Sequence, residues 1–318
     1  MLPASLVFVF SVMMTSISKE YYQFILAQGL LGGCAMGLTM APGLSAIGQY
    51  FNKNRGAAMG LGVAGSSIGG VIFPIAISRM FANPHLGFGW TIRISGFIIL
   101  GPLLVASAFV RARLPPRRGR FFILAAFKEK AYITLVIAIF LIMLGLFTPF
   151  FYLPTYAIER GMSTQLASYL VSILNGASFF GRVIPGIMAD KVGRLNMQMA
   201  ASVSSGILIF CLQKMETNGT IIVFAALYGF TSGAIVSLMS VNLAQIPKNP
   251  SDIGTYMGQG MAVVAIGALI GPPANGALVA RFGGFDQSLI MSGVFVVAGG
   301  LFVIVAKMAA NKGIFTKF

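Results

Sequence analysis

The chain has 318 residues, of which 57% are hydrophobic and only 9% are charged, and its formal net charge is +15. A soluble domain of this length could not bury so much apolar surface, so the composition excludes a soluble globular protein. Apolar runs recur along the whole length, each able to cross a bilayer as a helix of ~20 residues, and they predict an all-α polytopic membrane bundle.

Four predicted spans precede the only long polar stretch of the chain, and they cover residues 2–17, 22–47, 56–80 and 92–110. Six further spans follow it, at residues 131–153, 164–188, 197–213, 220–244, 254–280 and 288–306. The polar stretch therefore divides the chain into an N-terminal bundle at 1–110, a basic linker at 111–130 and a C-terminal six-helix bundle at 131–318.

The basic residues predict how the spans are oriented. Ten spans place both termini on one side of the membrane, and that side receives 16 of the 22 Lys and Arg residues. Because basic loops stay preferentially in the cytoplasm, we predict a cell-membrane protein with both termini and the linker on the cytoplasmic side. The positive charge is scattered over short loops, which argues against a nucleic-acid partner.

The linker combines basic and aromatic residues. Phe121, Phe122 and Phe127 lie beside basic side chains, a composition typical of a short helix at the inner membrane interface. A loop tethered near acidic lipids is the alternative, and the sequence favours neither.

An internal repeat supports the division into two bundles. A shift of 198 positions aligns the start of segment 56–80 with the start of segment 254–280, and eight of 19 aligned positions are identical, Gly56 with Gly254 and Pro74 with Pro272 among them. Halves that run in the same direction, related by an axis along the membrane normal, are typical of the major facilitator architecture, which has six helices in each half.

Three stretches carry a more specific resemblance. Residues 50–70, residues 150–156 with 172–182, and the turn Gly-x-x-x-Asp-Lys-x-Gly-Arg at 186–194 are similar to fungal monocarboxylate-porter members of the major facilitator superfamily. The resemblance covers essentially the whole chain, and it implies that the chain begins at the family's third helix and holds ten of twelve. The first half of the fold would then be incomplete and lack one wall of the cavity, through an error of the gene model or a real truncation.

Arg182 is the main candidate for contact with a substrate. It lies in an apolar span, where a charge costs about 2.5–3.5 kcal/mol even on insertion scales, and its planar guanidinium can bind a carboxylate bidentately. The resemblance places it where the family is thought to meet the substrate carboxylate. Alternatively, Arg182 snorkels to the headgroups or pairs with Asp190. The uncharged polar residues that we expect either in the cavity or bonded to neighbouring helix backbones are Tyr152, Tyr156, Asn175, Ser178 and Gln259.

The turn that follows this span predicts a gate. We expect Asp190 to lie against the positive N-terminus of the helix that begins near Gly254, a contact worth ~0.3–1 kcal/mol that breaks when the two halves rock. An ordinary charged turn is the alternative. The residues assigned to the gate are Gly186, Asp190, Lys191, Gly193 and Arg194.

The residue inventory argues against an enzyme. The sequence has no phosphate-binding loop, no metal-ligand spacing, and no nucleophile with a histidine or carboxylate at membrane depth, so we expect neither a cofactor nor a metal. Asn218 begins an Asn-Gly-Thr sequon on the exterior side, in a loop that is short for glycosylation.

These observations predict a monomeric secondary transporter among membrane lipids. Its substrate would be a small organic anion, monocarboxylate-like, or an amphipathic metabolite, moved by alternating access. An efflux pump for a fungal secondary metabolite and a truncated remnant without transport activity are the alternatives. No carboxylate lies deep within a span, so the sequence does not support proton coupling through a buried acid.

Overall fold

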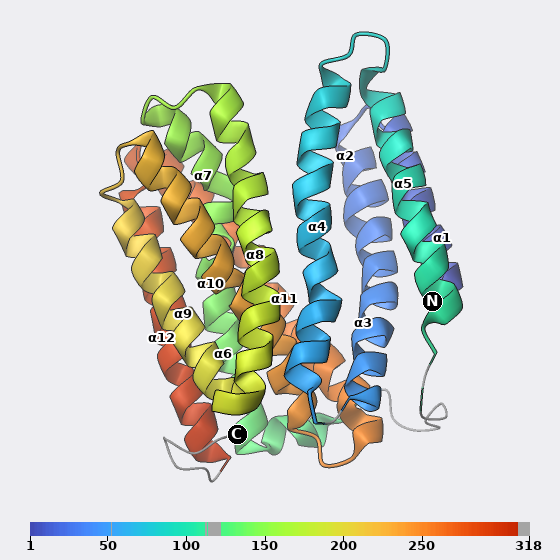
Figure 1. Cartoon of the computed structure of the whole chain (residues 1–318), viewed down its shortest axis with the longest axis vertical. Coiled ribbons are helices and arrows are strands. Elements are labelled where there is room, and N and C mark those ends of the chain that lie inside the picture. The colour runs from blue at the N-terminus through green and yellow to red at the C-terminus, as the bar shows by residue number, and fades with distance from the viewer. Residues whose placement is uncertain (52, 112, 114–121, 311–318) are drawn as a thin grey trace. The chain divides into compact units, whose positions relative to one another are not determined.

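The computed structural model describes residues 1–51, 53–111, 113 and 122–310, and this part of the chain contains helices and turns but no β-strand (Figure 1). Nine helices within it are long and apolar enough to cross a membrane, and α1 (Leu2–Ile17) is a shorter apolar helix of 16 residues. The expected all-α membrane bundle is therefore confirmed.

Before the linker, α1 is followed by α2 (Tyr21–Phe24), the π-helical segment η1 (Ile25–Gly32), α3 (Gly33–Tyr50), α4 (Arg55–Phe81) and α5 (Gly87–Phe109). After it come the 3₁₀ helix η2 (Leu124–Lys128), α6 (Lys130–Leu146), α7 (Thr148–Glu159), α8 (Thr164–Val192), α9 (Arg194–Leu212), α10 (Asn218–Gln245), the 3₁₀ helix η3 (Pro250–Asp252), α11 (Ile253–Phe282) and α12 (Asp286–Ala309).

The predicted span 131–153 differs most from the observed helices, because it is interrupted at Phe147 and continues to Glu159. Pro149 lies in the first turn of α7 and has no N–H with which to bond the carbonyl of Gly145 four residues earlier. The first turn of a helix tolerates this loss, so a new helix begins there.

The chain divides into two compact units. Unit 1 consists of Met1–Tyr50 and Ile72–Pro116, and unit 2 of Phe51–Val71 and Arg117–Phe318. Helix α4 therefore contributes its first part to unit 2 and its second part to unit 1. The division into bundles at the linker 111–130 stays a prediction.

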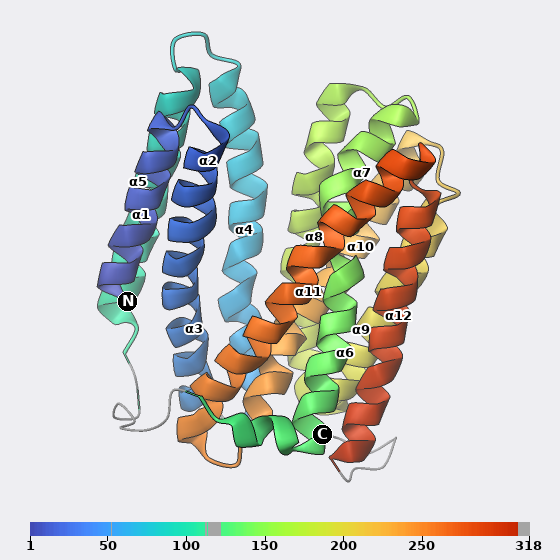
Figure 2. The same cartoon turned by 180° about the vertical axis from the view of Figure 1, so that it is seen from behind.

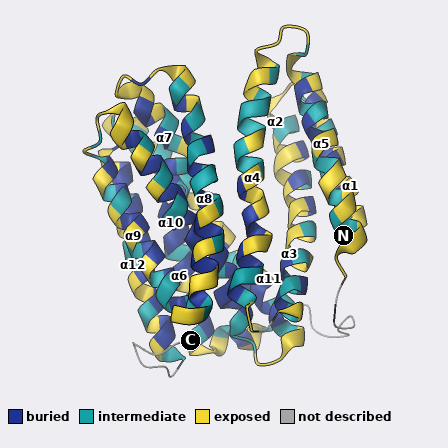
Figure 3. Ribbon diagram, viewed as in Figure 1, coloured by how far each residue is buried: buried dark blue, intermediate teal, exposed yellow. Residues whose placement is uncertain are grey.

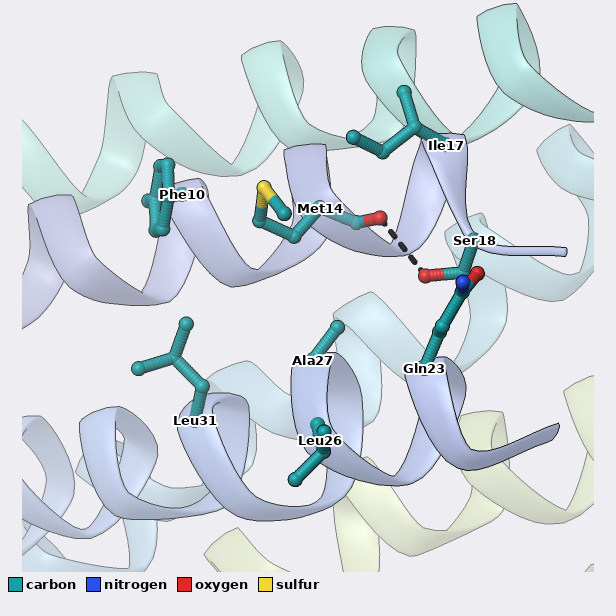
Figure 4. Close-up of a pocket in the computed structure, with 8 residues that line it drawn as sticks. All are labelled: Phe10, Met14, Ile17, Ser18, Gln23, Leu26, Ala27 and Leu31. Atoms are coloured by element: carbon teal, nitrogen blue, oxygen red, sulfur yellow. Dashed lines mark hydrogen bonds between the residues drawn. The ribbon is translucent and has the colours of Figure 1, made fainter. Parts of the chain in front are cut away.

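In unit 1, α1 and α5 lie side by side (Figures 1 and 2). Gly96 permits the close approach, because a Cβ atom there would come within 2.8 Å of the Met13 side chain. The hydroxyls of Ser5 and Ser107 are hydrogen-bonded at 3.2 Å between the same helices. A cavity of about 390 Å³ separates α1 from the start of the next span (Figure 4), and it is lined by Phe10, Met14, Ile17, Ser18, Gln23, Leu26, Ala27 and Leu31.

In unit 2, α10 runs through the core, and most of its second half is buried (Figure 3). It packs against α8 at small residues. A Cβ atom on Gly233 would lie 2.6 Å from the carbonyl oxygen of Ser178, so glycine is needed for the two backbones to meet. Thr217 caps the start of α10 by accepting a hydrogen bond from the Thr220 N–H at 3.3 Å.

Candidate functional site

One face of α8 carries three of the predicted polar side chains. Asn175, Ser178 and Arg182 are spaced three and four residues apart, which places them on the same side of the helix. This face packs against the first part of α4, which belongs to the same unit. The candidate site is therefore the seam between α8 and residues 55–71 of α4.

Arg182 is only 7% exposed, although it is charged. Its Nη1 donates to the backbone carbonyl of Val63 at 2.9 Å and also hydrogen-bonds the hydroxyl of Ser66. The Nε is buried and has no hydrogen-bond partner among the residues that the structure describes. The guanidinium thus keeps one buried donor for which the described part of the chain provides no acceptor.

The two alternatives for Arg182 are snorkelling to the headgroups and a pair with Asp190. Helix α8 continues for ten residues beyond Arg182 to Val192, a rise of ~15 Å at 1.5 Å per residue. Its guanidinium is bonded at Val63, eight residues inside α4, and the carboxylate of Asp190 bonds other groups. The structure therefore shows neither snorkelling to the end of the helix nor an Arg182–Asp190 pair.

No acidic side chain of the described part of unit 2 lies at the depth of Arg182. The seven acidic residues of the sequence are all at helix ends or between helices, namely Glu20, Glu129, Glu159, Asp190, Glu216, Asp252 and Asp286. A buried charge without a counter-ion is costly. An anionic ligand would supply the missing charge.

The two neighbours of Arg182 on α8 contact α4 as well. The hydroxyl of Ser178 accepts a hydrogen bond from Ser67 at 3.4 Å, and both side chains are fully buried. The Asn175 amide packs against Gly70 of α4, and a Cβ atom at Gly70 would collide with this amide. The Nδ2 of Asn175 donates to the Val171 carbonyl within α8 at 2.9 Å.

The other predicted polar residues bond neighbouring backbone. Tyr152 donates to the Pro272 carbonyl at 3.0 Å, and Tyr156 donates to the Leu212 carbonyl at 2.7 Å. Gln259 bonds the backbone of the linker through both ends of its amide. The structure thus brings together Asn175, Ser178 and Arg182, whereas Tyr152, Tyr156 and Gln259 lie apart from them.

Asp190 caps the first turn of α4. Its Oδ1 accepts from the Gly56 N–H at 3.2 Å and its Oδ2 from the Ala57 N–H at 3.1 Å. Arg194 donates to Oδ1 through Nε at 3.1 Å and Nη2 at 2.9 Å, and its Nη1 reaches the amide oxygen of Gln245 at 3.2 Å. These contacts join four helices of unit 2 at one end.

The expectation that Asp190 meets the helix near Gly254 is wrong. The carboxylate bonds the N-terminus of α4 at Gly56 instead. Both positions offer a positive helix N-terminus, because the internal repeat aligns Gly56 with Gly254. The repeat alone therefore did not identify which of the two helices receives the carboxylate.

Three further residues of the predicted gate differ in their surroundings. Gly186 touches α4, since a Cβ atom there would lie 2.9 Å from the Gly56 carbonyl oxygen. Gly193 links α8 to α9 with a φ of +109°, a conformation that glycine adopts readily. Lys191 is exposed.

The sequon residue Asn218 is exposed too, in the first turn of α10.

Two residues that hold the site side chains carried little signal in the sequence. Gln245, which holds Arg194, was placed just beyond the end of a predicted span, and its position at a helix end was the only available signal. Ser66, which bonds Arg182, lies among the small residues of 55–71 and carried no distinguishing pattern.

Comparisons with known proteins agree with this architecture. A family profile described as Major Facilitator Superfamily matches residues 1–245. The aspyridones efflux protein of Emericella nidulans is 52% identical over 311 residues, which cover 98% of this chain and 63% of that protein. The agnestins efflux protein of Paecilomyces divaricatus is 39% identical over 318 residues, covering 98% of this chain and 72% of its own length.

The fold also matches a solved structure. A crystal structure of the Escherichia coli fucose:proton symporter aligns with a TM-score of 0.72 at 14% identity, and the alignment covers 95% of this chain and 82% of the symporter. This likeness shows the fold alone. Taken with the family profile and the relatives, it shows that the chain belongs to the Major Facilitator Superfamily.

Proposed function

We propose that this chain acts in a secondary transporter that moves a small organic anion or an amphipathic metabolite by alternating access. Membership of the superfamily supports transport rather than catalysis. Two similar fungal proteins are named as efflux proteins, which supports export of a secondary metabolite as the direction and cargo class. The chain spans 63% of the length of the first of these relatives, so the activity is a proposal for the whole protein.

The observation that carries the proposal is the environment of Arg182. The guanidinium is buried, is held from one side by Val63 and Ser66, and keeps an unpartnered Nε. Hydrogen bonds that involve a charged group are worth about 1.5–3 kcal/mol, so a substrate carboxylate at Nε would gain affinity and neutralise the charge.

The test is transport by the purified chain in liposomes, with aspyridones and a simple monocarboxylate as two probes. We expect Arg182→Gln to abolish transport of any probe that is carried as an anion, and Arg182→Lys to restore only part of it, because an ammonium cannot form the bidentate fork. The matched control is Arg160→Gln, since Arg160 is exposed and pairs with Glu216 at the other end of unit 2.

Either of two results would count against the proposal. Full transport of an anionic probe by Arg182→Gln would remove the proposed role of Arg182. A folded wild-type chain that transports no probe would favour the alternative of a remnant without transport activity.

The proposed orientation has both termini on the cytoplasmic side of the cell membrane. In the described part of unit 2, one end of the bundle carries eight basic and three acidic residues, and the other carries three of each. Because basic residues stay preferentially on the cytoplasmic side, we assign the first end, which includes Asp190 and Arg194, to the cytoplasm. We propose a monomer as the working unit.

A further inference from the structure

The last residues of the linker are attached to α11 at their start. The amide of Gln259 accepts a hydrogen bond from the Ile123 N–H at 3.0 Å and donates to the Ile123 carbonyl at 3.2 Å. Gln259 is only 4% exposed, so water competes little for these bonds. This double contact fixes the chain immediately before the 3₁₀ helix η2.

The same segment is attached to α11 at its other end. Tyr256 donates to the Glu129 carboxylate at 2.7 Å, and Tyr132 donates to the Tyr256 carbonyl at 2.7 Å. Ala126, between these two attachments, is fully buried. Residues 123–130 therefore form a fixed ledge on unit 2 that includes the short helix η2, while Phe121 lies outside the described residues. The placement of this segment at the inner membrane interface stays a prediction.

The ledge presents apolar and basic side chains outward together. Phe122 is 57% exposed and Leu124 is 70% exposed. Lys128 and Lys130 are exposed as well, while the carboxylate of the intervening Glu129 accepts the hydrogen bond from Tyr256. We call these four residues, Phe122, Leu124, Lys128 and Lys130, the linker patch.

The surroundings of the linker patch are positively charged. Besides Lys128 and Lys130, the described part of unit 2 carries six basic and three acidic residues at this end. The acidic residues at this end are Glu129, Asp190 and Asp252, and the first two have their carboxylates hydrogen-bonded to Tyr256 and to the start of α4. The field at the patch therefore favours an anion.

We propose that the linker patch binds an anionic phospholipid of the membrane. Phe122 and Leu124 would contact the acyl chains, and the ammonium groups of Lys128 and Lys130 would contact the phosphate of a headgroup that carries no compensating cation. A basic residue near an anionic membrane surface contributes about 1 kcal/mol, so two of them give a roughly 30-fold preference over a zwitterionic lipid. The proposal does not depend on the transport activity.

Tryptophan fluorescence in vesicles tests the proposal. Trp90 is the only tryptophan of the sequence, so Trp90→Phe with Leu124→Trp places a single reporter in the patch. The full chain is reconstituted with brominated phosphatidylglycerol or brominated phosphatidylcholine in an unbrominated background. We expect half-maximal quenching at a roughly 30-fold lower fraction of the anionic lipid, and we expect Lys128→Gln with Lys130→Gln to remove this difference.

The matched control is Trp90→Phe with Phe151→Trp, because Phe151 is also an exposed aromatic residue of unit 2 but lies in α7. Both brominated lipids should quench this reporter equally. Equal quenching of the reporter at position 124, or no quenching there, would overturn the proposal. If the tryptophan variants fail to fold, native mass spectrometry of the wild-type chain and the double lysine variant decides the matter, since retention of anionic lipid that is equal in both would overturn it too.

Discussion

Single glycines determine how closely α4 and α8 approach each other. A Cβ atom at Gly56 would lie 2.6 Å from the carbonyl oxygen of Gly186, and one at Gly60 would lie 2.5 Å from the carbonyl oxygen of Arg182. Real Cβ atoms do not occupy such positions, so any other residue would push the helices apart. The contacts of Arg182 with α4 depend on this spacing.

Gly60→Ala should therefore destabilise the protein. Overpacking a close contact costs about 1–3 kcal/mol of folding free energy. Replacing glycine by alanine within a helix gains at most ~1 kcal/mol, so we expect a net loss of stability. Gly65→Ala is the matched control in the same helix, because nothing lies within 4 Å of the added methyl group. Thermal unfolding in detergent should show a lower midpoint for Gly60→Ala alone. Equal midpoints for the two variants would show that the helices separate without cost.

At the scale of the element, a buried polar network holds the second half of α11. The amide oxygen of Asn275 accepts hydrogen bonds from Ser288 at 2.7 Å and from Ser292 at 2.9 Å, both on α12. Ser292 is also bonded to Thr148 of α7 at 2.7 Å. All four side chains are almost fully buried, so the network joins three helices where no water can replace a lost partner.

The hydrogen bond between Asn275 of α11 and Ser288 of α12 should give a measurable coupling energy. Asn275→Leu leaves two buried hydroxyls without their acceptor, whereas Ser288→Ala removes only one donor. A double-mutant cycle on Asn275 and Ser288, followed by denaturant unfolding in micelles, should give a coupling energy of about 0.6 kcal/mol and at most about 1.7 kcal/mol, the mean and the largest value for such bonds in membrane helices. A coupling energy of zero would mean that Asn275 acts through packing alone.

Hydropathy predicted most helices to within a few residues, because the length of a span follows from the thickness of the bilayer. It did not predict the π-helical segment Ile25–Gly32 or the break at Phe147, since both depend on local backbone geometry within a uniformly apolar run. The position of Arg182 within an apolar span likewise made it a candidate for a buried charge, with snorkelling to the headgroups as the alternative. Its partners Val63 and Ser66 could not be predicted, because they depend on the rotation of one helix against another.

At the scale of the whole molecule, Asp190 connects parts of the chain that are far apart in sequence. Its carboxylate bonds the start of α4, 134 residues earlier, and it is oriented by Arg194, which also reaches Gln245 of α10. In a carrier that works by alternating access, such contacts stabilise one conformation. The structure shows Asp190 bonded to the start of α4 and to Arg194, and we predict that these contacts keep α4 against α8.

Asp190→Asn should open this seam more often. The substitution weakens the cap on α4 and the pair with Arg194, and the loss of a helix cap costs about 1 kcal/mol, which corresponds to a roughly fivefold larger open population. Ser67→Cys reports on the seam because Ser67 is fully buried against Ser178. In a background with Cys34→Ser and Cys211→Ser, a thiol reagent should label this site about five times faster when Asp190→Asn is present.

A second buried position separates opening of the seam from general loosening. Ser232 is also fully buried, but it lies in α10 and bonds the Gly229 carbonyl of its own helix. Ser232→Cys should therefore stay protected in Asp190→Asn. If both sites become labelled, the substitution has destabilised the whole of unit 2. If neither does, Asp190 is an ordinary charged turn, because a gate that contributes to closure cannot lose its charge without changing how often the seam opens.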